Sequence, residues 1–265
     1  MNVRWQVAAY LFASIVLWVV SAQVTRQQAN GAGMRRLGQG WPAVVLRFAY
    51  YVGLPYAALV LGVIPSSYMG LAGLGRLPSP QGDPGAHHLL ARFRAAASHL
   101  VLTWLPDLGT MAGIAAVMCL LLSVVWVGYG LSRGRMAPGA DGTSAYPSPP
   151  TAPSLVHISY QAVHWSFYRS GVWLLTGDPY LGVVGGILLI GAEWLLGAGG
   201  AEGKRSIFLS EAQMLDITLL IATSVIFYFV PNLWLLIPIH WLLALVCQRM
   251  MRLGVIRHQR DFVQG

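Results

Sequence analysis

The sequence HWSFYR, which runs from His164 to Arg169, places a histidine and an arginine inside an otherwise apolar segment. Two later apolar segments carry one further ionisable residue each: Glu193 in GGILLIGAEWLL and His240 in LWLLIPIHWLLALV. A charge at the centre of a bilayer costs roughly 2.5 to 3.5 kcal/mol on insertion scales, so such residues normally face the inside of a helical bundle and contact one another. We therefore expect residues 155–251 to form the core of the molecule.

The composition is that of a polytopic membrane protein. Hydrophobic residues make up 56% of the chain and charged residues only 10%, and the mean hydropathy is +0.59. These values exclude an ordinary soluble domain. The net charge of +8 does not indicate nucleic-acid binding, because the arginines lie between apolar segments rather than on one amphipathic face. Cys119 and Cys247 each fall inside an apolar segment without CxxC spacing, which argues against a disulfide or a zinc-thiolate site.

The chain contains about seven segments long enough to cross a bilayer, since a membrane-spanning helix needs about 20 apolar residues. The predicted fold class is all-α: a polytopic membrane helical bundle with about seven transmembrane helices. The expected spans are residues 5–22, 42–64, 107–131, 155–176, 180–198, 212–230 and 232–251.

The distribution of basic residues predicts the orientation of these spans. With the C-terminus in the cytoplasm, eleven basic residues lie on the inside and four on the outside. The inner set is Arg26, Arg35, Arg36, Arg133, Arg135, Lys204, Arg205, Arg249, Arg252, Arg257 and Arg260, and the outer set is Arg4, Arg76, Arg92 and Arg94. This excess predicts an N-terminus outside and a C-terminus in the cytoplasm.

Two polar connectors divide the chain into parts. Residues 1–133 form an N-terminal three-span part whose loop, 65–97, we expect to lie at the membrane interface with a short amphipathic helix near LLARFRAAASHL. Residues 134–154 are rich in Pro, Gly and Ser and predict a disordered linker. Residues 155–265 form a four-span core with a basic C-terminal tail.

The spacing along the predicted helices places the three intramembrane residues at similar depths. Counted from the outer ends of their spans, His164, Glu193 and His240 lie roughly 18, 20 and 12 Å deep at the helical rise per residue. Two histidines and a carboxylate are suitable ligands for a divalent metal such as Zn or non-haem Fe(II), and could also activate a water. The alternative is a structural network in which Arg169 pairs with Glu193, and the histidines bond to backbone groups freed by Pro238.

These motifs resemble those of the CAAX-protease and bacteriocin-processing family of intramembrane proteases, also called type II CAAX prenyl endopeptidases. That family has EExxxR, FxxxH and HxxxN motifs on successive helices. HWSFYR keeps Arg169 of the first motif, but His164 and Trp165 stand where the two glutamates belong. LIGAE places Glu193 where the second motif has histidine. The last segment, FVPNLWLLIPIHWLLA, keeps His240 but ends in alanine instead of a polar residue.

The resemblance implies a divergent member of the family with degenerate motifs. Its site residues would be His164, Glu193, His240 and Arg169, acting in peptide hydrolysis, and the first three would hold a metal if one binds. It also implies a bacterial inner membrane and a membrane peptide or partner membrane protein as the molecule acted upon. Two other classes remain open: a non-catalytic scaffold or partner subunit that uses its basic tail at an anionic leaflet, and a small-solute or proton-coupled carrier.

Overall fold

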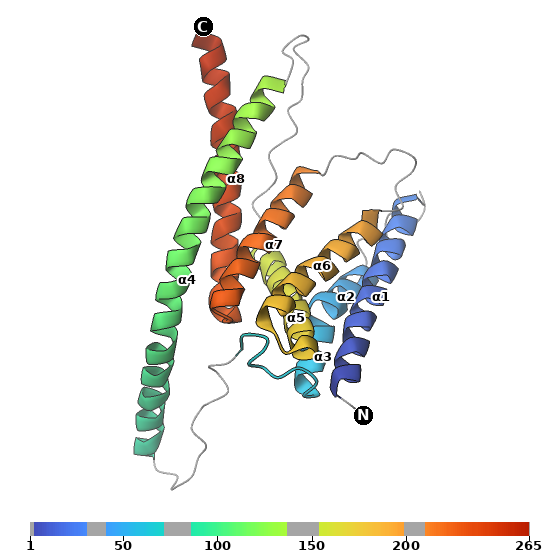
Figure 1. Ribbon diagram of the computed structural model, residues 1–265, viewed down its shortest axis with the longest axis vertical. Coiled ribbons are helices and arrows are strands. Elements are labelled where there is room, and N and C mark those ends of the chain that lie inside the picture. Colours follow the sequence, from blue (N-terminus) through green and yellow to red (C-terminus); the bar gives the residue numbers. More distant parts are fainter. Residues whose placement is uncertain (1–2, 31–40, 72–85, 137–153, 199–209, 265) are drawn as a thin grey trace.

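The structure is a computed structural model that describes residues 3–30, 41–71, 86–136, 154–198 and 210–264, and within these ranges every regular element is a helix (Figure 1). The elements are α1 (Val3–Asn30), α2 (Trp41–Phe48), the π-helical segment η1 (Ala49–Gly53), α3 (Leu54–Val60), α4 (Ala86–Met136), α5 (Leu155–Thr176), α6 (Pro179–Ala198), α7 (Glu211–Phe229) and α8 (Leu233–Gln264). The all-α prediction is confirmed.

Five of these helices are long and apolar enough to cross a membrane: Val3–Val24, Trp104–Ser132, Pro179–Leu196, Glu211–Phe229 and Leu233–Leu253. The other two expected spans differ from these. The segment 42–64 is helical only up to Val60 and includes the π-helical segment, and its apolar stretch, Val44–Val60, is short. Helix α5 has the expected length but is more polar, because it lies inside the bundle. The expected count of seven therefore holds only approximately.

Helix α5 is the central helix of the molecule. Eleven of its residues are buried, including His164, Trp165, Tyr168 and Arg169. It receives contacts from α1, η1, α3, α6 and α8. Since α5 is enclosed by protein on several sides, it can carry polar residues that a lipid-facing helix could not.

Three glycines allow α6 to pack closely against α5. A Cβ atom at Gly182 would lie 2.6 Å from Trp173 Cβ, one at Gly185 2.7 Å from Val172 Cγ1, and one at Gly186 2.8 Å from Arg169 Cγ. The two helices form a tight hairpin, which turns at Gly177 with a φ of +79° and continues at Asp178, whose Oδ1 accepts a hydrogen bond from the backbone N–H of Tyr180 at 2.7 Å. Small residues at this spacing are typical of close helix packing in membranes.

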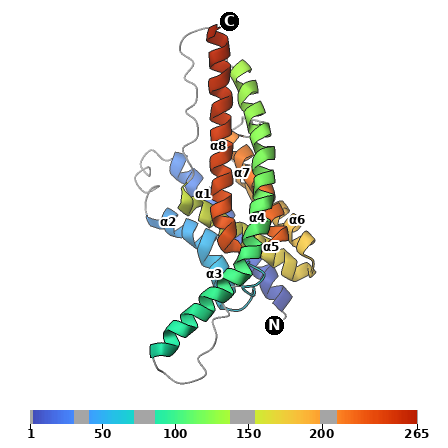
Figure 2. The same ribbon diagram turned by 90° about the vertical axis from the view of Figure 1, so that its left-hand side faces the viewer.

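Helices α4 and α8 lie side by side along one flank of the bundle (Figures 1 and 2). α4 has 51 residues, so the short interfacial helix expected near residues 89–100 is instead the beginning of one long helix that continues into the span. A helix therefore covers these residues as expected, but it is longer than predicted, because Pro106 lies within α4 without ending it. Figure 2 shows that the first part of α4 projects away from the other helices. Apart from residues 134–136 and Ser154, the expected linker lies outside the described residues.

The chain runs back and forth across the bundle. Gln161 contacts Asp216 near the beginnings of α5 and α7, and further along both helices Arg169 contacts Thr223. α5 and α7 are therefore parallel, and α6 between them is antiparallel. At the turn between α7 and α8, Gly70 approaches so closely that its carbonyl accepts a hydrogen bond from Leu233 N at 2.8 Å. With a φ of +73° and Pro231 O only 2.8 Å from a would-be Cβ, this position requires glycine.

Candidate functional site

Glu193, on α6, forms the centre of a buried group of polar side chains. Its side chain is 3% exposed. Carboxylate oxygen Oε2 accepts a hydrogen bond from the Tyr50 hydroxyl at 2.6 Å, and Oε1 accepts one from the Tyr168 hydroxyl. His164 Nε2 lies 3.4 Å from Oε2. We call Tyr50, His164, Tyr168 and Glu193 the Glu193 cluster.

Four helical elements bring this cluster together. His164 and Tyr168 are separated by four residues on α5 and so lie on one face of it. Tyr50 lies in the π-helical segment, where the wider turn changes the direction in which side chains project. π-helical turns inside α-helices are found frequently at functional sites. α1 closes the cluster, because Trp18 Nε1 donates to the backbone carbonyl of Glu193 at 2.6 Å.

Aromatic rings surround the imidazole of His164. The ring centroid of Tyr50 lies 4.2 Å from it, that of Tyr168 4.6 Å and that of Tyr51 5.5 Å. This packing holds the imidazole with Nε2 towards Glu193, while Nδ1 has no hydrogen-bond partner among the described residues. The Ser14 hydroxyl lies 3.0 Å from the hydroxyl of Tyr168 and adds a further polar group behind the carboxylate.

His240 does not join the cluster. Its imidazole is fully buried and stacks on Trp165 with ring centroids 5.0 Å apart, and within the described part of the chain neither ring nitrogen has a hydrogen-bond partner. Neighbouring residues of an α-helix point about 100° apart. His164 therefore faces α6, while Trp165 faces α8 and separates His240 from Glu193. Similar depth in the membrane did not imply contact.

The expected metal triad is consequently not assembled. Of His164, Glu193 and His240, the structure brings only the first two together. Across the described residues, no group of three or more His, Cys, Asp or Glu side chains is placed to hold a metal ion. The tyrosine hydroxyls occupy the positions around Glu193 that a second histidine would need.

Arg169 is buried apart from Glu193, so the expected alternative of an Arg169–Glu193 pair is also wrong. The guanidinium is 1% exposed, its Nη2 donates to the Thr223 hydroxyl at 3.1 Å, and its Cζ lies 5.4 Å from the ring centre of Phe227. Its Nε and Nη1 have no partner among the described residues. Arg169 follows Tyr168 directly and therefore projects from a different side of α5.

Further polar groups lie along α5, although Ser166 and Ser170 project from a different side of the helix than His164 and Tyr168. Towards its beginning, Gln161 Nε2 donates to Asp216 Oδ1 at 3.4 Å. Towards its end, the hydroxyls of Ser166 and Ser170 donate to the backbone carbonyls of Met69 and Tyr68 at 2.9 and 2.7 Å. Buried polar groups thus follow the central helix through most of its length.

Comparisons with known proteins do not assign this chain to a family, so its function has to be argued from the geometry of the site. The chain matches no family model, no curated protein and no solved structure.

The chemistry available to the cluster is proton binding. The cluster combines a carboxylate, two hydroxyl groups and an imidazole, and side chains of these types take part in proton transfer in proteins. Its basic member is an imidazole rather than an arginine or a lysine.

Two members of the cluster, Tyr50 and Tyr168, were not among the expected site residues. The signal for Tyr168 is its position four residues after His164, which places both side chains towards the same neighbour. Tyr50 could not be placed from the sequence, because the segment 42–64 was interpreted as an uninterrupted helix and the π-helical segment changes its facing.

Proposed function

We propose that this chain is a proton-coupled membrane protein in which Glu193 carries the coupled proton. The observation that carries the proposal is the Glu193 cluster: an intramembrane carboxylate held by two tyrosine hydroxyls and a histidine, apart from the buried arginine. Ionisable residues inside membrane bundles commonly mark ion pathways and proton relays. The function is accordingly that of a carrier for protons or a small solute.

The depth of Glu193 supports this proposal. It lies 14 residues after Pro179, which begins α6, or about 21 Å along the helix at 1.5 Å per residue. The carboxylate is thus well inside a hydrocarbon layer about 30 Å thick. A group at this depth needs a path for its proton. Polar groups next to the cluster include the Ser14 hydroxyl beside Tyr168 and the amide of Gln161, which lies one turn before His164 on α5 and bonds to Asp216.

Proton movement in reconstituted vesicles tests the proposal. The purified protein is inserted into vesicles containing a pH-sensitive dye, and a membrane potential is imposed. We expect proton uptake that Glu193→Gln abolishes and Glu211→Gln preserves. Glu211 is a matched control, because it also accepts a hydrogen bond from a tyrosine, Tyr129, at 3.2 Å, but lies at the start of α7. Absence of uptake in the wild type, or equal uptake by Glu193→Gln, contradicts the proposal.

A second candidate is peptide hydrolysis by a divergent member of the CAAX-protease type. It is favoured by the contact of His164 with Glu193, which could serve as a general base, and by an apolar recess of about 160 Å³ nearby. The recess is lined by Val52, Pro55, Tyr56, Leu59, Met69, Leu71, Val163, Leu233, Trp234 and Ile237. In this function the recess would accept an acyl or prenyl chain, and the reaction would proceed without His240.

Cleavage of membrane peptides by the purified protein separates the two functions. If peptide hydrolysis is the function, Glu193→Gln abolishes cleavage, Glu211→Gln preserves it, and vesicles show no proton uptake. If proton coupling is the function, no cleavage depends on Glu193. A scaffold role has no comparable support, since the pair of Arg169 with Glu193 that it requires is not formed.

The distribution of basic residues supports a cytoplasmic C-terminus, whereas a bacterial inner membrane is suggested by the resemblance to the intramembrane protease family. Helices α1 and α4 carry large apolar side chains that are more than half exposed, including Trp5, Phe12, Leu120 and Val124. Such surfaces need lipid around them. A bilayer is thus the partner of the outer face in either proposed function.

A further inference from the structure

Among the residues that the structure describes, the buried guanidinium of Arg169 has no anionic partner. Among the described residues it forms no ion pair with a carboxylate, and Thr223 is the one hydrogen-bond acceptor that it reaches. An isolated charge buried without a counter-charge is very costly, and buried charges in proteins are normally paired. Thr223 and the ring of Phe227 together provide only neutral partners.

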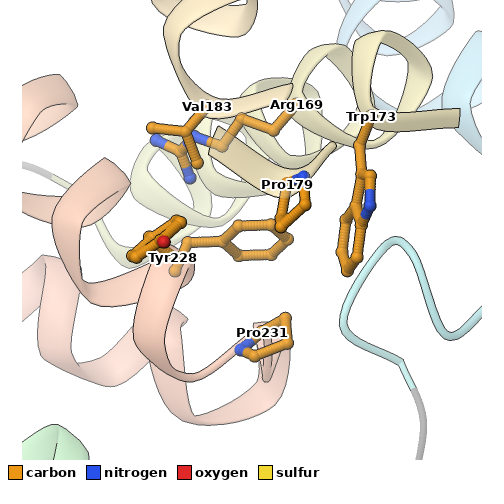
Figure 3. A pocket seen from close by; sticks show the side chains of 7 residues that line it. Arg169, Trp173, Pro179, Val183, Tyr228 and Pro231 are labelled. Atoms are coloured by element: carbon orange, nitrogen blue, oxygen red, sulfur yellow. The ribbon is translucent and has the colours of Figure 1, made fainter. Parts of the chain in front are cut away.

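A small pocket lies directly beside this guanidinium (Figure 3). Its volume is about 20 Å³, and its lining residues come from the ends of α5 and α7, the beginning of α6 and the following turn. They are Arg169, Trp173, Pro179, Val183, Phe227, Tyr228 and Pro231. We call this space the Arg169 pocket. A water molecule needs about 10 to 15 Å³ measured in this way, so the pocket has room for one particle of water or halide size.

The lining of the pocket combines one charged residue with mostly apolar side chains. Arg169 contributes the charged group, and its Nε and Nη1 remain available as donors. The other lining residues are aromatic, proline or valine side chains. Asp178, the acidic residue next to Pro179 in sequence, is exposed and its Oδ1 is engaged by the N–H groups of Tyr180 and Leu181. A single negative charge would thus meet a cation in apolar surroundings, where electrostatic attraction is strong.

We propose that the Arg169 pocket binds one halide ion, chloride under ordinary conditions, as the counter-charge of the guanidinium. The site lies about 10 Å along α5 from Thr176, the end of that helix, at 1.5 Å per residue. It is therefore close to the face of the bundle where α5 turns into α6 and α7 into α8. This site is separate from the Glu193 cluster and does not depend on the function proposed for that cluster.

Binding of radioactive chloride tests the proposal. The full chain is placed in nanodiscs of zwitterionic lipid, and saturable binding is measured with and without competing anions. We expect one chloride per chain, displaced by bromide but not by gluconate, which is too large for the pocket. Arg169→Gln should weaken binding on the order of 100-fold, the scale of removing one partner of a buried charge pair. Arg47→Gln makes the same charge change at an exposed position and should leave binding unchanged.

A second variant keeps the test valid if Arg169→Gln does not fold. Val183→Ile adds one methylene group to the wall of the pocket while leaving the guanidinium in place, and should weaken chloride binding and bromide competition together. Chloride should also raise the melting temperature of the wild type relative to gluconate, since a ligand that binds only the folded state stabilises it. Absence of saturable binding, equal binding by Arg169→Gln, or displacement only by anionic lipid would overturn the proposal.

Discussion

Glu193 and Arg169, two buried charged residues of the described part of the chain, have opposite surroundings, although Arg169 lies on α5 and Glu193 contacts the same helix. Glu193 is met by two hydroxyl donors and an imidazole. Arg169 is met by one hydroxyl acceptor, an aromatic ring and a small pocket. The difference shows that the bundle does not neutralise its charges by pairing them with each other. The acid has its partners within the protein, whereas the base leaves space for a partner from outside.

The largest expected effect comes from removing the acid. Glu193→Leu leaves the hydroxyls of Tyr50 and Tyr168 without their acceptor inside the bundle. A buried donor left without an acceptor costs about 1 to 3 kcal/mol, so the two hydroxyls together should lower the unfolding free energy by about 2 to 6 kcal/mol. Reversible unfolding in mixed micelles measures it, with Glu211→Leu as the control at the start of α7. A loss below that of Glu211→Leu would mean that the cluster does not stabilise the fold.

A smaller effect should follow from removing one donor at a time. Tyr50→Phe deletes the hydrogen bond to Glu193 Oε2, and a hydrogen bond to a charged group contributes about 1.5 to 3 kcal/mol. Tyr51→Phe is the matched control, because it removes the neighbouring hydroxyl, which does not bond to Glu193, and should change stability by less than about 0.5 kcal/mol. Equal losses in both variants would show that Tyr50 acts through packing alone.

The contact between α5 and α6 supports both charged regions, and glycine substitutions in α6 test it. Gly186→Ala places a methyl group 2.8 Å from Arg169 Cγ and should destabilise the protein by about 1 to 3 kcal/mol. Gly191→Ala, on the same helix, meets no atom within 4 Å and should be neutral or stabilising by about 0.4 to 1 kcal/mol. If both substitutions change the unfolding free energy in the same direction, α5 and α6 pack less closely than the structure indicates.

The smallest change in unfolding free energy, and one in the opposite direction, is expected when Arg169 is replaced. In gluconate buffer, where the pocket holds no halide, Arg169→Met exchanges an unpaired buried cation for an apolar side chain of similar length. The unfolding free energy should stay unchanged or rise by about 1 kcal/mol. Measuring Glu193→Leu and Arg169→Met in the same buffer gives the contrast directly. A loss for Arg169→Met as large as for Glu193→Leu would contradict the view that the two charges are satisfied differently.

The sequence predicted the helical class, most span boundaries and the contact of His164 with Glu193, because apolar period and depth along a helix can be counted from residues. It did not predict which neighbouring helix each side chain contacts. His240 has a depth similar to that of the cluster but lies behind Trp165. Tyr50 was missed because the π-helical segment turns its side chain in a different direction from that in a regular α-helix. The residues AYYVG do not indicate this change of helix type. The contacts of Arg169 with Thr223 and Phe227 could not be predicted from the sequence, because they depend on how α7 packs against α5.

The most direct test of the central claim is an infrared titration of the protein in lipid, which observes the protonated carboxyl group of Glu193 itself. The account predicts a carboxylic acid band that appears as pH falls, is absent in Glu193→Gln and is preserved in Glu211→Gln. Proton exchange at that group would be consistent with its place in the cluster and with the proposed coupling. A Glu193 that stays ionised at every pH at which the protein remains folded would contradict the account.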